Sequence, residues 1–393
     1  MKHLRKILFL LALANALAGF SQPQLSDKAQ ISVLSCGAGS DLYTTFGHSA
    51  FRVQDADLGI DVVYNYGTFN FDPPGFYVDF ARGKLIYRLS RQRLDNFLFD
   101  YEMENRWVKE QLLDLTTTEK NALFQFLENN YSPENREYQY DFFYDNCASK
   151  IRDVLQEVLG NRLVFDESYL ENPYTFRELI HQNLSTNSWS AFGIDLALGC
   201  VIDKKASASE HLFLPNYVLL QLGHASLDQR PLVLRQRTVL DKAPLKNGDY
   251  FLSGPLFWFI LLLLFVIVIS YIDYRNNVRS RWLDFFLFFL TGIIGILICF
   301  LWFLTDHTAT VGNFNILWAF PGNLVLAFYF AKHKPFPSWI PKYFLVLPAL
   351  LVLTLFIWVI KFQVFSVLII PLLLTLGLRY LLLAHQFHVS KKK

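Results

Sequence analysis

The amino-acid sequence predicts an α+β domain outside the cytoplasm, followed by an all-α domain of about five transmembrane helices. Three observations support this prediction. The N-terminus has the form of an export signal, the next part mixes charged, aromatic and turn-forming residues as a globular domain does, and long apolar runs fill the chain after Tyr250. The hydrophobic fraction of 53% is therefore concentrated towards the C-terminus, and the net charge of +2 gives no reason to expect nucleic-acid binding.

Residues 1–21 are expected to form a signal peptide. Basic residues open the chain, residues 7–17 are apolar, and small residues including the motif Ala16-Leu17-Ala18 follow, as at a cleavage site. The apolar run is short for a membrane span. A retained signal anchor is the alternative.

Residues 22–227 are predicted to be the soluble domain, which opens with β structure. Its β-branched and aromatic runs are short and are bounded by Gly, Asp or Asn, as strands joined by turns are. The predicted strands are residues 31–35, 48–53, 60–66 and 106–115. A helix is predicted next, because Thr116 and Glu119 have the spacing of a capping box and periodic apolar residues follow.

A second helix is predicted to begin at Cys147. Apolar residues recur with helical spacing up to Leu159, and Gly160 is a typical helix stop. Mixed helix and loop are predicted from there to about Leu222. Residues 228–249 resemble a linker to the membrane domain, which is predicted to occupy residues 250–390.

Five apolar runs after Tyr250 have the length of a membrane span. They are residues 251–272, 283–304, 314–330, 344–360 and 362–384. If the soluble domain is exported, basic residues gather in the segments on the cytoplasmic side, in agreement with the positive-inside rule. These residues are Arg275, Arg279, Arg281, Lys332, Lys334, Lys342, Lys391, Lys392 and Lys393. For the last two runs, a hairpin that only dips into the bilayer is the alternative.

Cys147 is the strongest candidate for chemistry. The unpaired N–H groups and the macrodipole at a helix start favour a thiolate, and the same N–H groups could stabilise the oxyanion formed when a carbonyl is attacked. The alternative is a small buried hydrophobic residue, because free cysteines are often buried. Cys36 and Cys200 form the only internal pair that would spare Cys147, while Cys299 falls inside the second span.

A thiolate nucleophile needs a base and a group that orients the base. His48 follows a glycine at the start of a predicted strand, and the next strand returns through Asn65, which could bond the imidazole. Papain-type enzymes use these residue types, whereas a lone strand histidine is more often structural. The histidines and cysteines show no metal-binding spacing and there is no Gly-rich phosphate loop, so neither a metal nor another cofactor is expected.

The motifs around these residues resemble one family, the Bacteroides-type lipoprotein N-acyltransferases. The resemblance covers about residues 30 to 220. It is carried by Gly47-His48-Ser49-Ala50-Phe51-Arg52-Val53, Val63-Tyr64-Asn65-Tyr66-Gly67-Thr68-Phe69, Asn105-Arg106 and Tyr140-Asp141-Phe142-Phe143-Tyr144-Asp145-Asn146-Cys147-Ala148, with weaker similarity at residues 195–199 and 213–215. The multi-span C-terminal part of this chain also resembles that of the family.

The resemblance implies a circularly permuted papain-like fold of the NlpC/P60 group, in the periplasm, on a multi-pass protein of the bacterial inner membrane. It implies transfer of an acyl chain from a membrane phospholipid, through a thioester on Cys147, to the α-amine of an S-diacylglyceryl cysteine on a lipoprotein. Cys147 and His48 carry over from the family motif, and Asn65 is placed by hairpin geometry as much as by motif.

Two other functions stay open at this point. A hydrolase of the same fold could act on peptidoglycan peptides or on phospholipid, since one fold hosts many chemistries. A receptor without enzymatic activity is the other possibility, and a large separation between the side chains of Cys147 and His48 would favour it.

The predicted external loop at residues 305–313 is a candidate entrance for membrane substrates. It contains Asp306 and His307, and Trp318 follows it as a candidate interfacial anchor. His307 is expected to hydrogen-bond a lipid headgroup. The alternative is that Asp306 and His307 form an ordinary solvated helix end.

Overall fold

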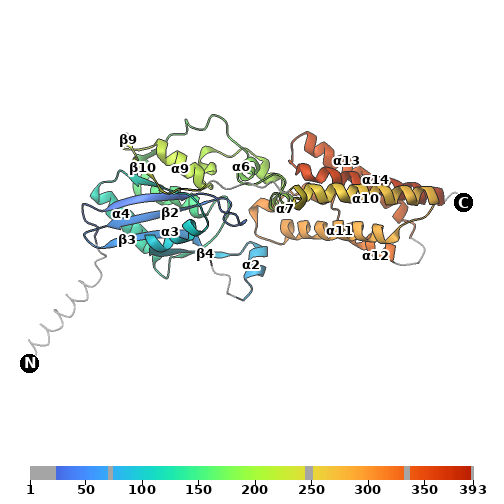
Figure 1. Ribbon diagram of the computed structural model, residues 1–393, viewed down its shortest axis with the longest axis horizontal. Coiled ribbons are helices and arrows are strands. Elements are labelled where there is room, and N and C mark those ends of the chain that lie inside the picture. Colours follow the sequence, from blue (N-terminus) through green and yellow to red (C-terminus); the bar gives the residue numbers. More distant parts are fainter. Residues whose placement is uncertain (1–23, 70–73, 244–250, 332–336, 391–393) are drawn as a thin grey trace, which may run out of the picture.

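The computed structural model describes residues 24–69, 74–243, 251–331 and 337–390. Figure 1 shows two parts that lie end to end: a domain built around a β-sheet, and an elongated bundle of helices. The predicted signal peptide at residues 1–21 lies outside the described residues. The predicted order, an α+β domain followed by a helical domain, is confirmed.

The first domain contains a seven-stranded sheet in which every neighbouring pair is antiparallel. Its strands, in spatial order, are β10 (Val233–Leu240), β5 (Val108–Leu113), β1 (Gln30–Cys36), β2 (His48–Asp55), β3 (Ile60–Thr68), β4 (Ile86–Arg93) and β6 (Glu137–Gln139). The four strands predicted from sequence are β1, β2, β3 and β5, and these occupy the centre of the sheet.

The structure differs from the predicted linker at residues 228–249. Residues 233–240 form the edge strand β10, which pairs with β5, and Arg237 forms an ion pair with Glu110 at 2.6 Å. Most of β10 is exposed, so its sequence is polar and lacks the apolar alternation of a central strand. Of residues 241–249, which complete the predicted linker, the structure describes only residues 241–243.

Helices cover both faces of the sheet. On one face lie α4 (Thr117–Tyr131), α5 (Cys147–Leu159) and α9 (Pro215–His224), and on the other lies α3 (Leu94–Met103). Successive side chains of a strand point to opposite faces. In β1, Ile31 and Val33 therefore belong to the core beneath α4 and α5, whereas Leu34 and Cys36 belong to the core beneath α3.

Shorter elements complete the first domain. They are α2 (Phe76–Arg82), η1 (Gly160–Arg162), β7 (Leu163–Phe165), α6 (Phe176–His181), α7 (Trp189–Ala197), η2 (Cys200–Asp203), α8 (Ala208–His211), β8 (Ala225–Leu227) and β9 (Arg230–Pro231). Strands β7, β8 and β9 form a second, small sheet. Figure 1 places α2 and α7 at the end of the domain that faces the helix bundle.

The described residues include five helical segments long and apolar enough to cross a membrane, so the predicted number of spans is confirmed. They are Pro255–Asn276, Arg281–Phe303, Phe314–Ala331, Ile340–Val359 and Val367–Gln386. The helices and 3-10 turns of this part are η3 (Phe251–Ser253), α10 (Pro255–Asn276), α11 (Arg281–Phe303), η4 (Thr308–Thr310), η5 (Phe314–Leu317), α12 (Gly322–Ala331), α13 (Ile340–Val359), η6 (Val367–Ile369) and α14 (Ile370–Ser390).

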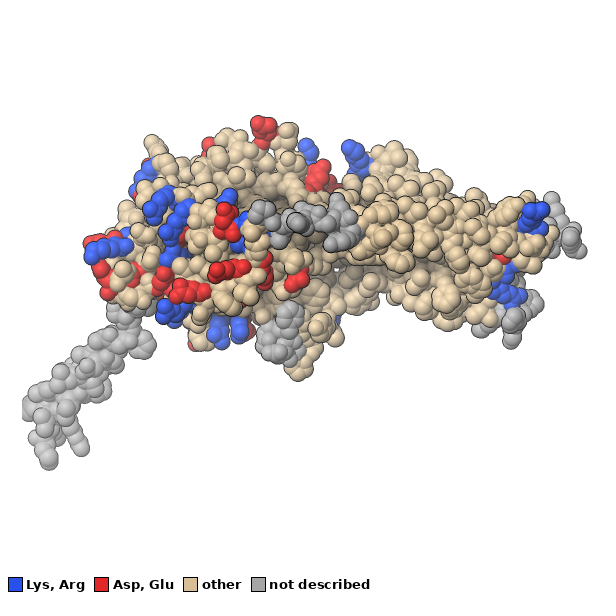
Figure 2. Space-filling view, in the orientation of Figure 1, with Lys and Arg blue, Asp and Glu red and all other residues tan. Residues whose placement is uncertain are grey.

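Charged side chains are distributed as a membrane protein requires. On the face shown in Figure 2, they gather on the sheet domain and at the far end of the bundle, and the bundle between these regions presents uncharged residues. Arg275, Arg279 and Arg281 lie where α10 ends and α11 begins, at the end remote from the sheet domain. This is the end predicted to be cytoplasmic.

A buried ion network holds three helices of the bundle together. Arg379 of α14 contacts Asp273 of α10 at 2.8 Å and Asp284 of α11 at 2.5 Å, and all three side chains are almost fully buried. Ser280, before α11, also donates to Asp273 through its hydroxyl. Because a buried charge is costly without a partner, the two carboxylates depend on Arg379.

Polar contacts also join the sheet domain to the bundle. The Gly199 N–H donates to the Ala309 carbonyl at 2.9 Å, and the Cys200 N–H donates to the Gly312 carbonyl at 3.0 Å. The buried Asn313 amide donates to the carbonyl of Leu196 at 2.8 Å. The loop between the second and third spans therefore pairs directly with the segment that contains α7 and η2.

Candidate functional site

The start of α5 fixes the position of Cys147. Asn146 is the N-cap, and its side-chain oxygen accepts from the N–H groups of Ala148 and Ser149, each at 2.9 Å. The Ser149 hydroxyl accepts in turn from the Asn146 N–H, which completes a capping box. The Asn146 amide also donates to the Phe213 carbonyl at 2.8 Å. Cys147 is thus the first helical residue, as predicted, on a rigidly anchored turn.

His48 and Asn65 meet across the hairpin of β2 and β3. The imidazole Nε2 and the Asn65 Oδ1 are 2.5 Å apart, so the predicted hydrogen bond is present. With Nε2 bound to Asn65, Nδ1 is the nitrogen left for Cys147, whose thiol lies within electrostatic reach of His48 and, like it, beside Gly67. The structure therefore brings the three predicted site residues together in the order Cys147, His48, Asn65.

Electrostatics favour charge separation within this pair. Burial raises the pKa of Cys147. The charge and hydrogen bond of His48, together with backbone N–H groups of Ser49 and Cys147, lower it by more than burial raises it, so the pKa lies below the usual 9.0. Burial lowers the pKa of His48, yet the sulfur charge and the Asn65 bond leave it above the usual 6.5. Both directions favour a thiolate beside an imidazolium.

The backbone donors beside the sulfur have a second use. The N–H groups of Ser49 and Cys147 point at the sulfur, and donors in that place can also stabilise an oxyanion formed by attack of the sulfur on a carbonyl. The sequence argument foresaw the donor at Cys147 but missed the one at Ser49, although Ser49 directly follows His48. The available signal was its position next to the candidate base at the start of a strand.

Gly67 leaves room for the pair. Its φ of +86° is a conformation that favours glycine, and a Cβ placed there would lie 3.4 Å from the Cys147 Cβ and 4.0 Å from the His48 Cε1. A side chain at this position would cover the sulfur. Gly67 lies in a motif noted in the sequence, and a glycine inside a strand commonly marks a close approach.

Arg106 lies behind His48 and is almost completely buried. Its Nε donates to the Gly37 carbonyl at 2.8 Å, and its Nη1 pairs with Glu104 at 2.9 Å. Its positive charge opposes protonation of His48, because like charges repel.

The remaining cysteines do not form the pair that the sequence suggested. All four cysteines are free thiols in the structure. Cys36 is buried at the end of β1, where burial raises its pKa to about 12, so its thiol stays neutral. Cys200 lies at the domain junction, close to Gly312. The pairing of Cys36 with Cys200 is therefore wrong for this structure.

Several tyrosines lie within electrostatic reach of the sulfur. Tyr87 and Tyr140 stack with ring centroids 4.0 Å apart, and both rings, like that of Tyr138, lie within electrostatic reach of Cys147. Burial raises the pKa of Tyr87 to about 12, so its hydroxyl is neutral near pH 7. The unusually aromatic stretch at residues 138–146 was the sequence signal for this environment, but Tyr87 on β4 gave none.

The external loop that contains Asp306 and His307 contacts the segment around α2. His307 Nε2 lies 3.0 Å from the Phe80 carbonyl, and Asp306 pairs with Lys84 at 3.6 Å, so both residues contact the segment around α2. Trp318 is only 2% exposed and donates to Asn315 at 2.8 Å. It is therefore a core residue of the bundle, and its prediction as an interfacial anchor is wrong.

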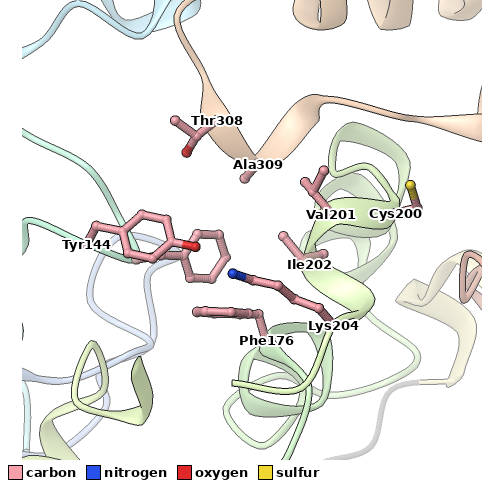
Figure 3. A pocket seen from close by; sticks show the side chains of 9 residues that line it. Tyr144, Phe176, Cys200, Val201, Ile202, Lys204, Thr308 and Ala309 are labelled. Carbon is pink, nitrogen blue, oxygen red and sulfur yellow. The ribbon is translucent and has the colours of Figure 1, made fainter. Parts of the chain in front are cut away.

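A cavity of about 360 Å³ lies beside this loop. Figure 3 shows the Lys204 ammonium extending between the rings of Tyr144 and Phe176, with Thr308 and Ala309 of the loop opposite. Lys204 also pairs with Glu210 at 3.3 Å. None of the three predicted catalytic residues lines this cavity, so it is separate from the Cys147 site.

Within the described part of the chain, no group of three or more His, Cys, Asp and Glu side chains has the arrangement of a metal site. The three side chains brought together at Cys147 are those of acyl-transfer chemistry by a thiolate, its base and an orienting amide.

Comparison with known families agrees with this arrangement. Residues 23–182, which contain His48, Asn65 and Cys147, match the family described as the Lnb N-terminal periplasmic domain. Residues 246–392 match the Lnb transmembrane domain, whose short name denotes five transmembrane helices. No curated protein and no solved structure matches the chain. The chain therefore belongs to the Lnb-type lipoprotein N-acyltransferase family, as a multi-pass membrane protein with a periplasmic N-terminal domain.

Proposed function

We propose that this protein transfers an acyl chain from a membrane phospholipid to the α-amine of an S-diacylglyceryl cysteine at the N-terminus of a lipoprotein. The observation that carries the proposal is the hydrogen-bonded series of Cys147, His48 and Asn65 in a domain joined directly to five membrane spans. Both substrates reside in the bilayer, so a tethered site meets them without a soluble carrier.

In the first half-reaction, the Cys147 thiolate attacks the carbonyl carbon of a phospholipid ester. The oxyanion that forms is placed to accept from the N–H groups beside the sulfur, a contribution worth about 3 kcal/mol per donor in enzymes of this type. When the C–O bond breaks, His48 gives its Nδ1 proton to the departing alkoxide. The products are a thioester on Cys147 and a lysophospholipid.

In the second half-reaction, the lipoprotein amine attacks the thioester carbonyl. Neutral His48 accepts the proton that the amine loses, and the C–S bond breaks to return the thiolate. The products are an amide and the initial ion pair. Asn65 keeps the imidazole in the orientation that both proton transfers require, because its oxygen accepts from Nε2 throughout.

The same first step would serve a phospholipase or, with an amide substrate, a peptidoglycan peptidase. Those enzymes pass the acyl group to water, and they need no membrane-embedded acceptor. The direct pairing of the loop between the second and third spans with the sheet domain favours the acyltransferase, because it holds Cys147 in a fixed relation to the bilayer. The contact between Cys147 and His48 speaks against a receptor without activity.

Mass spectrometry of a lipoprotein N-terminus tests the proposal. In cells that lack the gene, we expect the N-terminal cysteine to keep a free amine, and we expect the wild-type protein, but not Cys147→Ser, to restore the N-acylated mass. Cys36→Ser is the matched control, because this thiol is neutral and is not part of the series. Restored N-acylation by Cys147→Ser would refute the proposal, as would a hydrolysed lipid with an unmodified amine.

A further inference from the structure

Helix α2 presents large apolar side chains to its surroundings. Tyr77, Val78 and Phe80 are 76%, 58% and 56% exposed. At about 100° per residue, Tyr77 and Phe80 lie about 60° apart on one side of the helix, Val78 lies at the edge of that side, and Asp79 lies about 160° from Tyr77. A cluster of large exposed apolar residues on one short helix marks a contact surface, because scattered single residues are the normal pattern.

The location of α2 identifies what it contacts. The Asp306 N–H donates to the Arg82 carbonyl at 2.8 Å, and the His307 imidazole donates to the Phe80 carbonyl at 3.0 Å. Asp306 and His307 belong to the loop that joins the second and third spans. This loop marks the level at which the bundle leaves the bilayer on the periplasmic side, so α2 lies at the same level (Figure 1).

Gly83 makes this contact close. It ends α2 with φ of +73°, and a Cβ at this position would lie 2.9 Å from the His307 backbone nitrogen. A residue with a side chain would therefore push the loop away from the helix. The close approach of two backbones therefore adds to the side-chain contacts of His307 and Asp306 in holding the helix against the membrane domain.

A row of aromatic rings leads from α2 to the sulfur. Phe76, the buried residue of α2, stacks with Phe69 at a centroid distance of 6.1 Å. Phe69 contacts Tyr87 at 5.0 Å, and Tyr87 stacks on Tyr140 at 4.0 Å. Tyr87 and Tyr140 are among the rings within electrostatic reach of Cys147. The row of ring contacts is continuous from α2 to Tyr140.

We propose that α2 lies in the outer leaflet at the boundary of headgroups and acyl chains, and that the row of Phe76, Phe69, Tyr87 and Tyr140 guides one acyl chain of a phospholipid to Cys147. The position of α2 concerns lipid contact alone and is independent of catalysis. The guidance of an acyl chain rests on the proposed acyl transfer, and it specifies the donor as a long-chain lipid taken from the bilayer. Amphipathic helices with aromatic residues on the apolar side commonly lie at this depth.

Lipid contact is measured on the full-length protein in vesicles that contain a phospholipid with a photoactivatable acyl chain. After illumination, mass spectrometry locates the labelled peptides. We expect label on residues 77–80. The matched internal control is α3, where Phe99 and Met103 are 60% and 72% exposed but belong to a helix farther from the bundle (Figure 1). Label on α3 and none on α2 would overturn the proposed position.

Delivery of a lipid chain from α2 to the aromatic row is measured with the double variant Tyr77→Gln/Phe80→Gln. Acylation of Cys147 is followed with two donors, a long-chain phospholipid in vesicles and a short water-soluble ester. We expect the phospholipid rate to fall by about tenfold or more, because two large apolar contacts are lost, and the soluble-ester rate to stay unchanged. Phe99→Gln/Met103→Gln is the control and should preserve both rates. Equal losses with both donors would assign α2 a purely structural role and overturn the guidance.

The two proposals fail in different ways. If α2 is labelled and the wild-type protein forms no thioester on Cys147, the acyl transfer is refuted and the lipid contact stands. If Cys147 is acylated normally and α2 is not labelled, the acyl transfer stands and the role of α2 is refuted.

Discussion

Asn65 Oδ1 lies 2.5 Å from His48 Nε2, on the strand that pairs with the strand of the histidine. We expect Asn65→Ala to slow acylation of Cys147 by a soluble ester by roughly 10- to 100-fold, because a hydrogen bond to a charged group is worth about 1.5–3 kcal/mol. Asn65→Asp keeps an acceptor and should retain more of the rate. The burst of product release in a stopped-flow experiment gives both rates, and an unchanged rate in Asn65→Ala would exclude an orienting role.

Alkylation of Cys147 should depend on pH in a way set by His48. The pKa of Cys147 is lowered, so we expect its reaction with iodoacetamide to rise with pH with a midpoint below the ordinary thiol pKa of 9.0. In His48→Ala the main influence that lowers this pKa is gone while burial still raises it, so the midpoint should move upward. Mass spectrometry of the alkylated peptide measures both profiles. Coincident midpoints would show that the imidazole does not stabilise the thiolate.

Ester turnover should show a bell-shaped pH profile. The rate is expected to rise as Cys147 loses its proton and to fall again as His48 loses the proton that it gives to the leaving group. Because the pKa of Cys147 is lowered and that of His48 is raised, the active window is wider than ordinary cysteine and histidine would allow. The profile is obtained by measuring turnover of a soluble ester from about pH 5 to about pH 10, in steps of roughly one pH unit. A rate that only rises with pH would argue against an imidazolium proton donor.

His307→Ala should impair the reaction with membrane substrates selectively. The variant loses the hydrogen bond to the Phe80 carbonyl and loosens α2 at the membrane surface. We expect lower acylation by phospholipid in vesicles and an unchanged rate with a soluble ester. Lys84→Ala, which removes only an exposed ion pair with Asp306, is the milder control. Equal loss with both donors would place His307 in the chemistry itself.

Arg379→Ala should destabilise the helix bundle. Its removal leaves Asp273 and Asp284 buried without their main partner, and breaking a buried pair in this way costs about 3–5 kcal/mol. Thermal unfolding in detergent, followed by helix-specific circular dichroism, should show a lower midpoint. Arg275→Ala is the control, because Arg275 lies on the exposed side of α10. The triple variant Arg379→Met/Asp273→Asn/Asp284→Asn should recover part of the loss, and equal midpoints for Arg379→Ala and Arg275→Ala would contradict the network.

Sequence reasoning succeeded where local pattern and burial coincide. The central strands β1, β2 and β3 are apolar on buried faces, and α5 has a helical apolar period from a capped start to Gly160. The apolar spans were equally evident, because bilayer thickness fixes their length. His48 and Cys147 were found because their residue types and positions suit one chemistry.

The remaining errors concern contacts between distant parts of the chain. Trp318 was expected at the membrane surface, yet it is buried in the core that it shares with Phe288 of α11 and Phe344 of α13. Strand β10 was not predicted because an edge strand needs no apolar face. Tyr87 was not predicted as a neighbour of Cys147 because only the fold brings β4 beside the loop that precedes Cys147. No local pattern records such partners.

Strand β10 also determines when the sheet of the periplasmic domain can be completed during translocation. The sheet lacks its outer strand, and Glu110 lacks Arg237, until residues 233–240 have been translocated, shortly before Pro255 begins the first span. His48 and Cys147 thus reach the periplasm early but belong to an unfinished sheet during secretion. The periplasmic domain closes at about the moment when the first span enters the translocation machinery, so a soluble version that ends at residue 227 would present a bare sheet edge open to aggregation.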